Sequence, residues 1–69
     1  MTGNWQKIYT TLIGHQAEIV KGVLETHSIP AVVMNRKDSS YHFGHFEVLV
    51  PADHTIEALK IISDEINFK

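Results

Sequence analysis

Histidine is the residue type in this chain best suited to acid–base or metal chemistry, with five histidines among 69 residues. His42 and His45 are the closest pair, three residues apart around Phe43-Gly44. Residues three apart in a strand point to opposite faces, so this pair chelates a metal only if the chain bends between them. Metal sites usually need three or four ligands held by supporting hydrogen bonds. We therefore predict no metal site, and a metal-dependent sensor using His42 and His45 is the alternative.

A hydrolase-like set of groups occurs only between Asp38 and His42, which flank two serines and a tyrosine. A nucleophilic triad needs a rigid frame and an oxyanion hole, and a polar turn between strands supplies neither. Glu47 is explained more simply by a cross-strand ion pair with Lys7. The four glycines match neither a phosphate-binding loop nor a dinucleotide fingerprint. We therefore expect no catalytic residue, no enzymatic activity and no cofactor.

The segment between Asn35 and Tyr41 concentrates hydrogen-bond donors, acceptors and an aromatic ring in seven residues. Its aspartate and serines are typical of a turn held by side chain-to-backbone hydrogen bonds. The same groups are suited to binding an anion, a small polar ligand or a partner protein. The predicted contact residues at this hairpin tip are Arg36, Lys37, Asp38, Ser39, Ser40 and Tyr41.

Composition places the chain among small globular domains. It has 43% hydrophobic residues and a net charge of −2. It has no cysteine, which excludes disulfides, thiol catalysis and zinc ribbons. No apolar run approaches the roughly 20 residues that cross a bilayer, and the first residues do not resemble a signal peptide. The acidic balance argues against nucleic-acid binding. We expect one cytoplasmic domain over residues 1–69, with a core of about 5–66, that binds neither membrane nor nucleic acid.

Hydrophobic periodicity predicts five elements in the order β-α-β-β-α. Aromatic and β-branched residues favour strands, and apolar residues three and four apart favour helices. Pro30 and Pro51 mark boundaries. The predicted elements are a strand over 5–11, a helix over about 13–27, a strand over 31–35, a polar turn over 36–40, a strand over 43–50 and a helix after Asp53.

Three finer expectations follow for the helices. Gly22 is expected to allow close approach of the first helix to the sheet. Asp53 is expected to act as the N-cap of the second helix. The buried stripe of that helix is predicted to be Ile56, Leu59, Ile62 and Ile66.

Connection rules convert the element order into a fold. A right-handed crossover makes the first and second strands parallel, and the short link makes the third strand antiparallel between them. We predict an α+β fold: a ferredoxin-like β-α-β-β-α sandwich lacking its last strand, with a three-stranded sheet in the order 1-3-2 and two helices on one face. The first strand is then an edge strand.

The face of the sheet opposite the helices is the predicted surface for self-association. Alternation places Trp5, Lys7 and Tyr9 on this face, and Leu49 joins them there. Exposed edges of such composition also favour pairing with a second copy, so edge and face remain open. A further alternative is an RNA-binding platform on which Trp5 and Tyr9 stack bases, although the basic surround is sparse.

Four stretches together resemble a known bacterial family: residues 15–25, 29–33, 35–41 and 47–51. The chain is similar over about residues 5–66 to a domain of unknown function catalogued as a putative prokaryotic signal-transducing protein. The Lys-Asp-Ser-Ser-Tyr stretch resembles the variant common in Bacteroidetes. The resemblance implies a ferredoxin-like fold akin to small regulatory domains, without an established catalytic residue. We expect a non-enzymatic regulatory domain that forms a homodimer and binds a small polar ligand or a partner protein.

Overall fold

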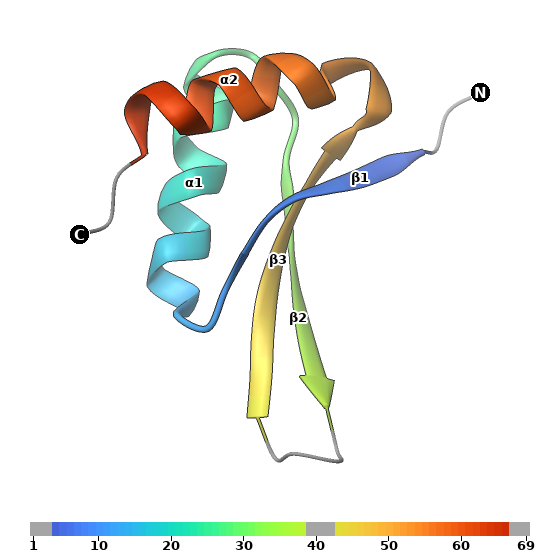
Figure 1. The fold of residues 1–69 in the computed structure, drawn as a ribbon, viewed down its shortest axis with the longest axis vertical. Helices are drawn as coiled ribbons and strands as arrows, with labels where there is room; N and C mark the ends of the chain where they lie inside the picture. Colours follow the sequence, from blue (N-terminus) through green and yellow to red (C-terminus); the bar gives the residue numbers. More distant parts are fainter. Residues whose placement is uncertain (1–3, 39–42, 67–69) are drawn as a thin grey trace.

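The computed structural model describes residues 4–38 and 43–66, and it confirms the predicted order of elements. Both outer strands pair antiparallel with the central strand, giving the predicted ferredoxin-like β-α-β-β-α arrangement with the sheet order β1-β3-β2 (Figure 1). No helix in these two ranges is long and apolar enough to cross a membrane. The elements are β1 (Trp5–Thr11), α1 (Gly14–Thr26), β2 (Val32–Asp38), β3 (Phe43–Pro51), the short 3-10 helix η1 (Ala52–His54) and α2 (Thr55–Glu65).

One face of β3 and both helices share a single hydrophobic core. Val48 and Val50 alternate along β3 with outward-facing residues, and both are fully buried. The buried side of α1, formed by Ala17, Val20 and Leu24, belongs to the same core. The core residues are Ala17, Val20, Leu24, Ile29, Ala31, Val48, Val50, Ala58 and Ile61. Among residues 4–38 and 43–66, the two helices therefore cover one face of the sheet.

The end of α1 is set by a backbone motif rather than by a glycine. Ser28 has a positive φ of 65°, and its amide donates to the carbonyl of Glu25 at 3.0 Å. The amide of Ile29 donates to the carbonyl of Leu24, also at 3.0 Å. These two bonds form a Schellman motif, in which the left-handed residue is usually glycine. The motif turns the chain so that Ile29 enters the core.

The predicted buried stripe of α2 was wrong in its first half. Ile56 is 78% exposed and Leu59 is also exposed, whereas Ala58 and Ile61 are buried. The turn of η1 precedes α2, so the helix begins at Thr55 and presents a different side to the sheet. The prediction that Asp53 caps α2 was wrong for the same reason, because it lies inside η1 and no side chain caps α2.

The glycine that permits close packing of α1 is Gly14, not Gly22. A Cβ added at Gly14 would lie 3.0 Å from the ring of Phe46, closer than ordinary van der Waals contact. A Cβ at Gly22 would meet no atom within 4 Å. The prediction for Gly22 was therefore wrong, because that position faces away from the sheet.

The β2–β3 hairpin is longer than predicted. Arg36, Lys37 and Asp38 were expected in a turn, but they continue β2 and pair with β3 as far as Asp38 opposite Phe43. Pairing between β1 and β3 stops earlier, at Thr11 opposite Phe46. The hairpin consequently projects beyond β1 and α1 as a two-stranded ribbon (Figure 1). Its connecting residues 39–42 lie outside the described part of the chain.

Candidate functional site on the open face of the sheet

The face of the sheet opposite the core, called the open face below, carries both apolar and charged side chains. Residues directly opposite one another in antiparallel strands share a face, so the register assigns its members. The buried Val48 and Val50 mark the covered face, and their neighbours on β3 belong to the open face. The open face comprises Trp5, Lys7, Thr10, Val32, Met34, Arg36, His45, Glu47, Leu49 and Pro51.

One half of the open face is apolar and accessible. Trp5 on β1 is 43% exposed and Met34 on β2 is 39% exposed, with Val32 also exposed. Leu49 lies between the two edge strands and is partly buried by its neighbours. The sequence-based placement of Trp5, Lys7 and Leu49 on one face is thus confirmed. Val32 and Met34 extend this apolar half and were not predicted, because their strand was interpreted as apolar on both sides.

Tyr9 does not lie on the open face, contrary to the prediction. The register of β1 against β3 shifts between Lys7 and Tyr9, where an irregularity inserts Ile8 as an extra residue. Tyr9 is consequently opposite the buried Val48, and it packs against the core together with Ile8. A strict alternation of faces fails at a bulge. The base-stacking platform of Trp5 and Tyr9 therefore loses one of its two rings.

The charged half of the open face is organised around the carboxylate of Glu47. His45 Nε2 lies 2.9 Å from its Oε2, and Arg36 Nε lies 3.2 Å from its Oε1. Lys7 Nζ approaches Oε2 at 3.9 Å, as the predicted ion pair requires. These four residues are called the Glu47 cluster below. All three strands contribute to it, and the Glu47 side chain is only 12% exposed.

The surroundings of Glu47 favour its ionised form and lower its pKa below the usual range of a glutamate. The hydrogen bond from His45 is the largest cause, and partial burial acts in the opposite direction. The hydrogen bond and charge of Arg36 and the charge of Lys7 lower the pKa further. Because an ionised carboxylate only accepts hydrogen bonds, the imidazole Nε2 carries a proton in this contact.

Sequence reasoning missed two members of the Glu47 cluster as partners of its carboxylate. His45 and Glu47 are two apart on β3 and therefore share a face. Arg36 lies directly opposite His45, but it was assigned to a turn and no cross-strand partner was sought. The alternation of side chains around Glu47 could be read from the sequence. The register between β2 and β3, which places Arg36 close to Glu47, could not.

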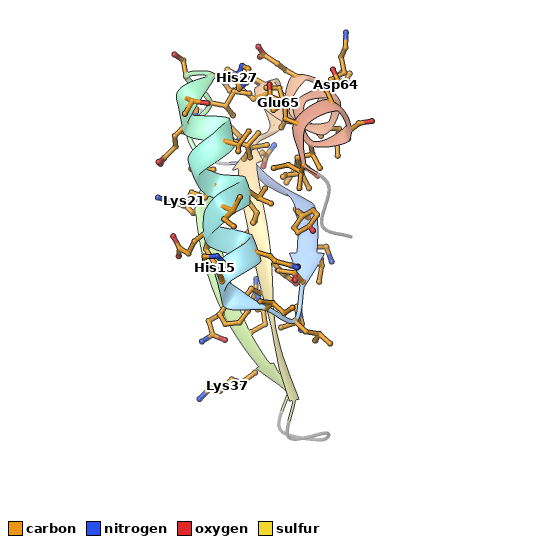
Figure 2. The ribbon with its side chains drawn as sticks, turned by 90° about the vertical axis from the view of Figure 1, so that its left-hand side faces the viewer. His15, Lys21, His27, Lys37, Asp64 and Glu65 are labelled. Carbon is orange, nitrogen blue, oxygen red and sulfur yellow. The ribbon has the colours of Figure 1, made fainter. Side chains whose placement is uncertain are left out.

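Two of the six predicted hairpin-tip residues, Arg36 and Lys37, have described side chains, and these lie on opposite sides of the ribbon, so the binding role of the set stays a prediction. Arg36 belongs to the open face, whereas the next residue, Lys37, alternates to the opposite side of the ribbon. Figure 2 shows Lys37 far from both helices, near the end of β2. The side chain of Asp38 and all of Ser39, Ser40 and Tyr41 lie outside what the structure describes.

Three histidines of the described ranges lie close to carboxylates: His27, His45 and His54. His45 Nε2 contacts Glu47, and His27 Nε2 lies 2.8 Å from Glu65 Oε2, joining the ends of α1 and α2 (Figure 2). Among residues 4–38 and 43–66, no three histidine, aspartate or glutamate side chains gather as metal ligands would. His42 lies outside these ranges, so the metal alternative of His42 with His45 stays a prediction.

The fold and the open face are those of a small α+β domain, and comparison with known proteins assigns its family. Residues 5–66 match the family model described as "Putative prokaryotic signal transducing protein". The match spans nearly the whole chain, so the protein belongs to this family of unknown function. Comparisons with curated proteins and with solved structures gave no match.

Proposed function

We propose that this protein is a non-enzymatic regulatory domain that forms a homodimer through its open face and responds to a small polar ligand. The observation that carries the proposal is the open face itself, where exposed Trp5, Val32 and Met34 lie beside the Glu47 cluster. Exposed apolar side chains grouped next to organised polar ones are typical of interaction surfaces. The family description supports a signalling role of this general kind.

The open face is favoured over the edge of β1 as the dimer interface. Natural edge strands resist pairing with other chains through bulges and lysines, and β1 has both, the bulge at Ile8 and the side chain of Lys7. The part of the open face that β2 and β3 form has no such irregularity, because their register runs without interruption from Val32 to Asp38. A second copy would bury the exposed apolar half of this face.

Regulation is proposed to act through the equilibrium between monomer and dimer. A ligand that binds one state more tightly shifts the population toward that state by its difference in affinity. A site that lies within or beside an interface therefore couples binding to assembly. The Glu47 cluster adjoins the apolar half of the open face, so it is positioned for such coupling.

The test is the oligomeric state of the untagged protein, measured by sedimentation velocity and native mass spectrometry. The wild type is expected to form a dimer. The double variant Trp5→Gln, Met34→Gln is expected to weaken dimerisation at least about tenfold, since it removes two apolar contacts of roughly 1 kcal/mol each.

The matched control is Ile56→Gln, Leu59→Gln, which changes two exposed apolar residues on α2. It is expected to dimerise as the wild type does, and circular dichroism verifies that both variants are folded. A wild type that is monomeric at every concentration tested would refute the proposal. Loss of the dimer only in the α2 control would refute the open face as the interface.

A further inference from the structure

The Glu47 cluster carries more positive than negative charge. Glu47 supplies one negative charge, whereas Lys7 and Arg36 each supply one positive charge and His45 adds another when protonated. The cluster therefore has a net charge of at least +1, although the whole chain has −2. A local excess of positive charge on an acidic protein needs a reason, because it attracts anions at this one place.

The basic side chains that surround Glu47 are accessible, although the carboxylate is not. The side chains of Lys7 and Arg36 are 54% and 53% exposed, against 12% for Glu47. They approach the same carboxylate from the two edge strands, so their outer ends flank it on both sides. Glu47 thus holds two cations close together, where they would otherwise repel each other.

Both cations have donors beyond those used on Glu47. An ammonium has three N–H donors and a guanidinium has five, while the contact of Arg36 with Glu47 uses only Nε. Guanidinium groups bind planar oxyanions through two parallel hydrogen bonds, and such charge-assisted bonds are strong. The ligand chemistry that fits is therefore an oxyanion with several acceptor oxygens, and a phosphate fits best because it has two negative charges.

Dimerisation through the open face would make neutralisation of the Glu47 cluster by a bound anion more favourable. Two apposed faces bring two positively charged clusters toward each other and remove both from water, which opposes assembly. When His45 is protonated the cluster carries two net positive charges, and a bound dianion would cancel them, so that the two apposed faces would no longer repel each other.

We propose that the Glu47 cluster is an oxyanion site of the phosphate class, bound by Lys7 and Arg36, and that its occupancy promotes the dimer. This inference rests on the proposed function for its link to assembly but not for the binding itself. Phosphate should then raise the dimerisation constant, and dimerisation should raise phosphate affinity by the same factor.

The test is an NMR titration of the ¹⁵N-labelled, untagged protein with inorganic phosphate at pH 7.5. Sodium chloride and sodium acetate at equal ionic strength serve as the comparison anions, and sedimentation velocity is run on the same samples. Saturable shifts are expected at the backbone of Lys7, Arg36 and His45, with weaker effects of acetate and none of chloride. Arg36→Gln is expected to weaken phosphate binding about tenfold, since it removes a charge-assisted hydrogen bond.

Matched controls separate a built site from general charge. Lys37→Gln changes the same charge one residue away on the other side of β2, and Lys21→Gln does so on α1, where Lys21 pairs with Glu25 at 3.2 Å. Both controls are expected to bind phosphate as the wild type does. Equal losses in Arg36→Gln and Lys37→Gln, or shifts that chloride reproduces, would overturn the proposal.

The two proposals fail in different ways. Saturable phosphate binding by a protein that stays monomeric supports the oxyanion site and contradicts the dimer and its coupling. A dimer that forms equally in phosphate and chloride, without shifts at the cluster, supports the proposed interface and overturns the oxyanion site.

Discussion

The two faces of the sheet differ in what their side chains contact. On the covered face, Val48 and Val50 are fully buried against both helices. On the open face, Leu49 lies between the same two residues in sequence, yet it borders Lys7 and Val32. Adjacent residues of one strand therefore differ in their surroundings, because Val48 and Val50 lie in the core whereas Leu49 lies on the face that we propose for contact with another molecule. In the described part of the chain, the hydrophobic core that stabilises the fold lies on one face of the sheet.

The covered face is expected to dominate stability. Leu24→Ala should lower the free energy of unfolding by about 2–5 kcal/mol, because it removes a fully buried side chain and leaves a cavity. The same substitution at Leu49, on the open face, should cost at most about 1 kcal/mol. Urea unfolding of dilute protein, followed by circular dichroism, measures both. Equal losses would mean that the open face also belongs to the folding core.

The two glycines of α1 also differ in their surroundings, because Gly14 lies against Phe46 whereas Gly22 faces away from the sheet. Gly22→Ala should stabilise the protein by about 1 kcal/mol, since alanine favours a helix interior and its Cβ meets no atom within 4 Å. Gly14→Ala should increase the stability of the protein less than Gly22→Ala does, or should decrease it, because the new Cβ would press on the ring of Phe46. Thermal unfolding of the two variants checks the order. A larger gain at Gly14 would show that Phe46 moves freely away.

The smallest expected effect on stability concerns the open face at acid pH. Because the pKa of Glu47 is lowered in the native state, the unfolded state binds more protons than the native state as the pH falls. The ionised carboxylate therefore stabilises the fold at pH values above the ordinary pKa of a glutamate. That contribution is lost as the pH falls through the native pKa of Glu47. Urea unfolding between about pH 5 and pH 3 should therefore show a smaller loss for Glu47→Gln than for the wild type.

Glu18→Gln, on the exposed surface of α1, is the control for this acid effect. It should follow the wild-type dependence on pH, because it leaves the Glu47 cluster intact. Identical curves for the wild type and Glu47→Gln would show that the cluster contributes nothing to acid stability and would leave its role to binding alone.

Local patterns in the sequence were sufficient for the elements and their order. The stripe of Ala17, Val20 and Leu24 recurs with the period of a helix, and the alternation around Val48 has the period of a strand. Connection rules then leave few topologies for β-α-β-β-α, and the observed sheet order is among them. The ion pair of Lys7 and Glu47 was predictable because the alternation of side chains along each strand placed both residues on the open face.

The predictions that failed depended on where a period was interrupted. The irregularity at Ile8 reverses the face of Tyr9, and η1 changes the side of α2 that is buried, which exposes Ile56. Neither interruption has a glycine or proline inside it to indicate its position. Both are selected by how the strand and the helix fit the rest of the core, which is a property of the packed molecule.

The class of fold was predictable from the sequence, because hydrophobic periods and short connections act locally along the chain. The candidate site was not, because it forms through contacts between separate strands. The Glu47 cluster takes one residue from β1, one from β2 and two from β3, and their contact depends on the register between strands far apart in sequence. A shift of one residue in either pairing would move Lys7 or Arg36 to the opposite face, so the site exists only once the strands have paired.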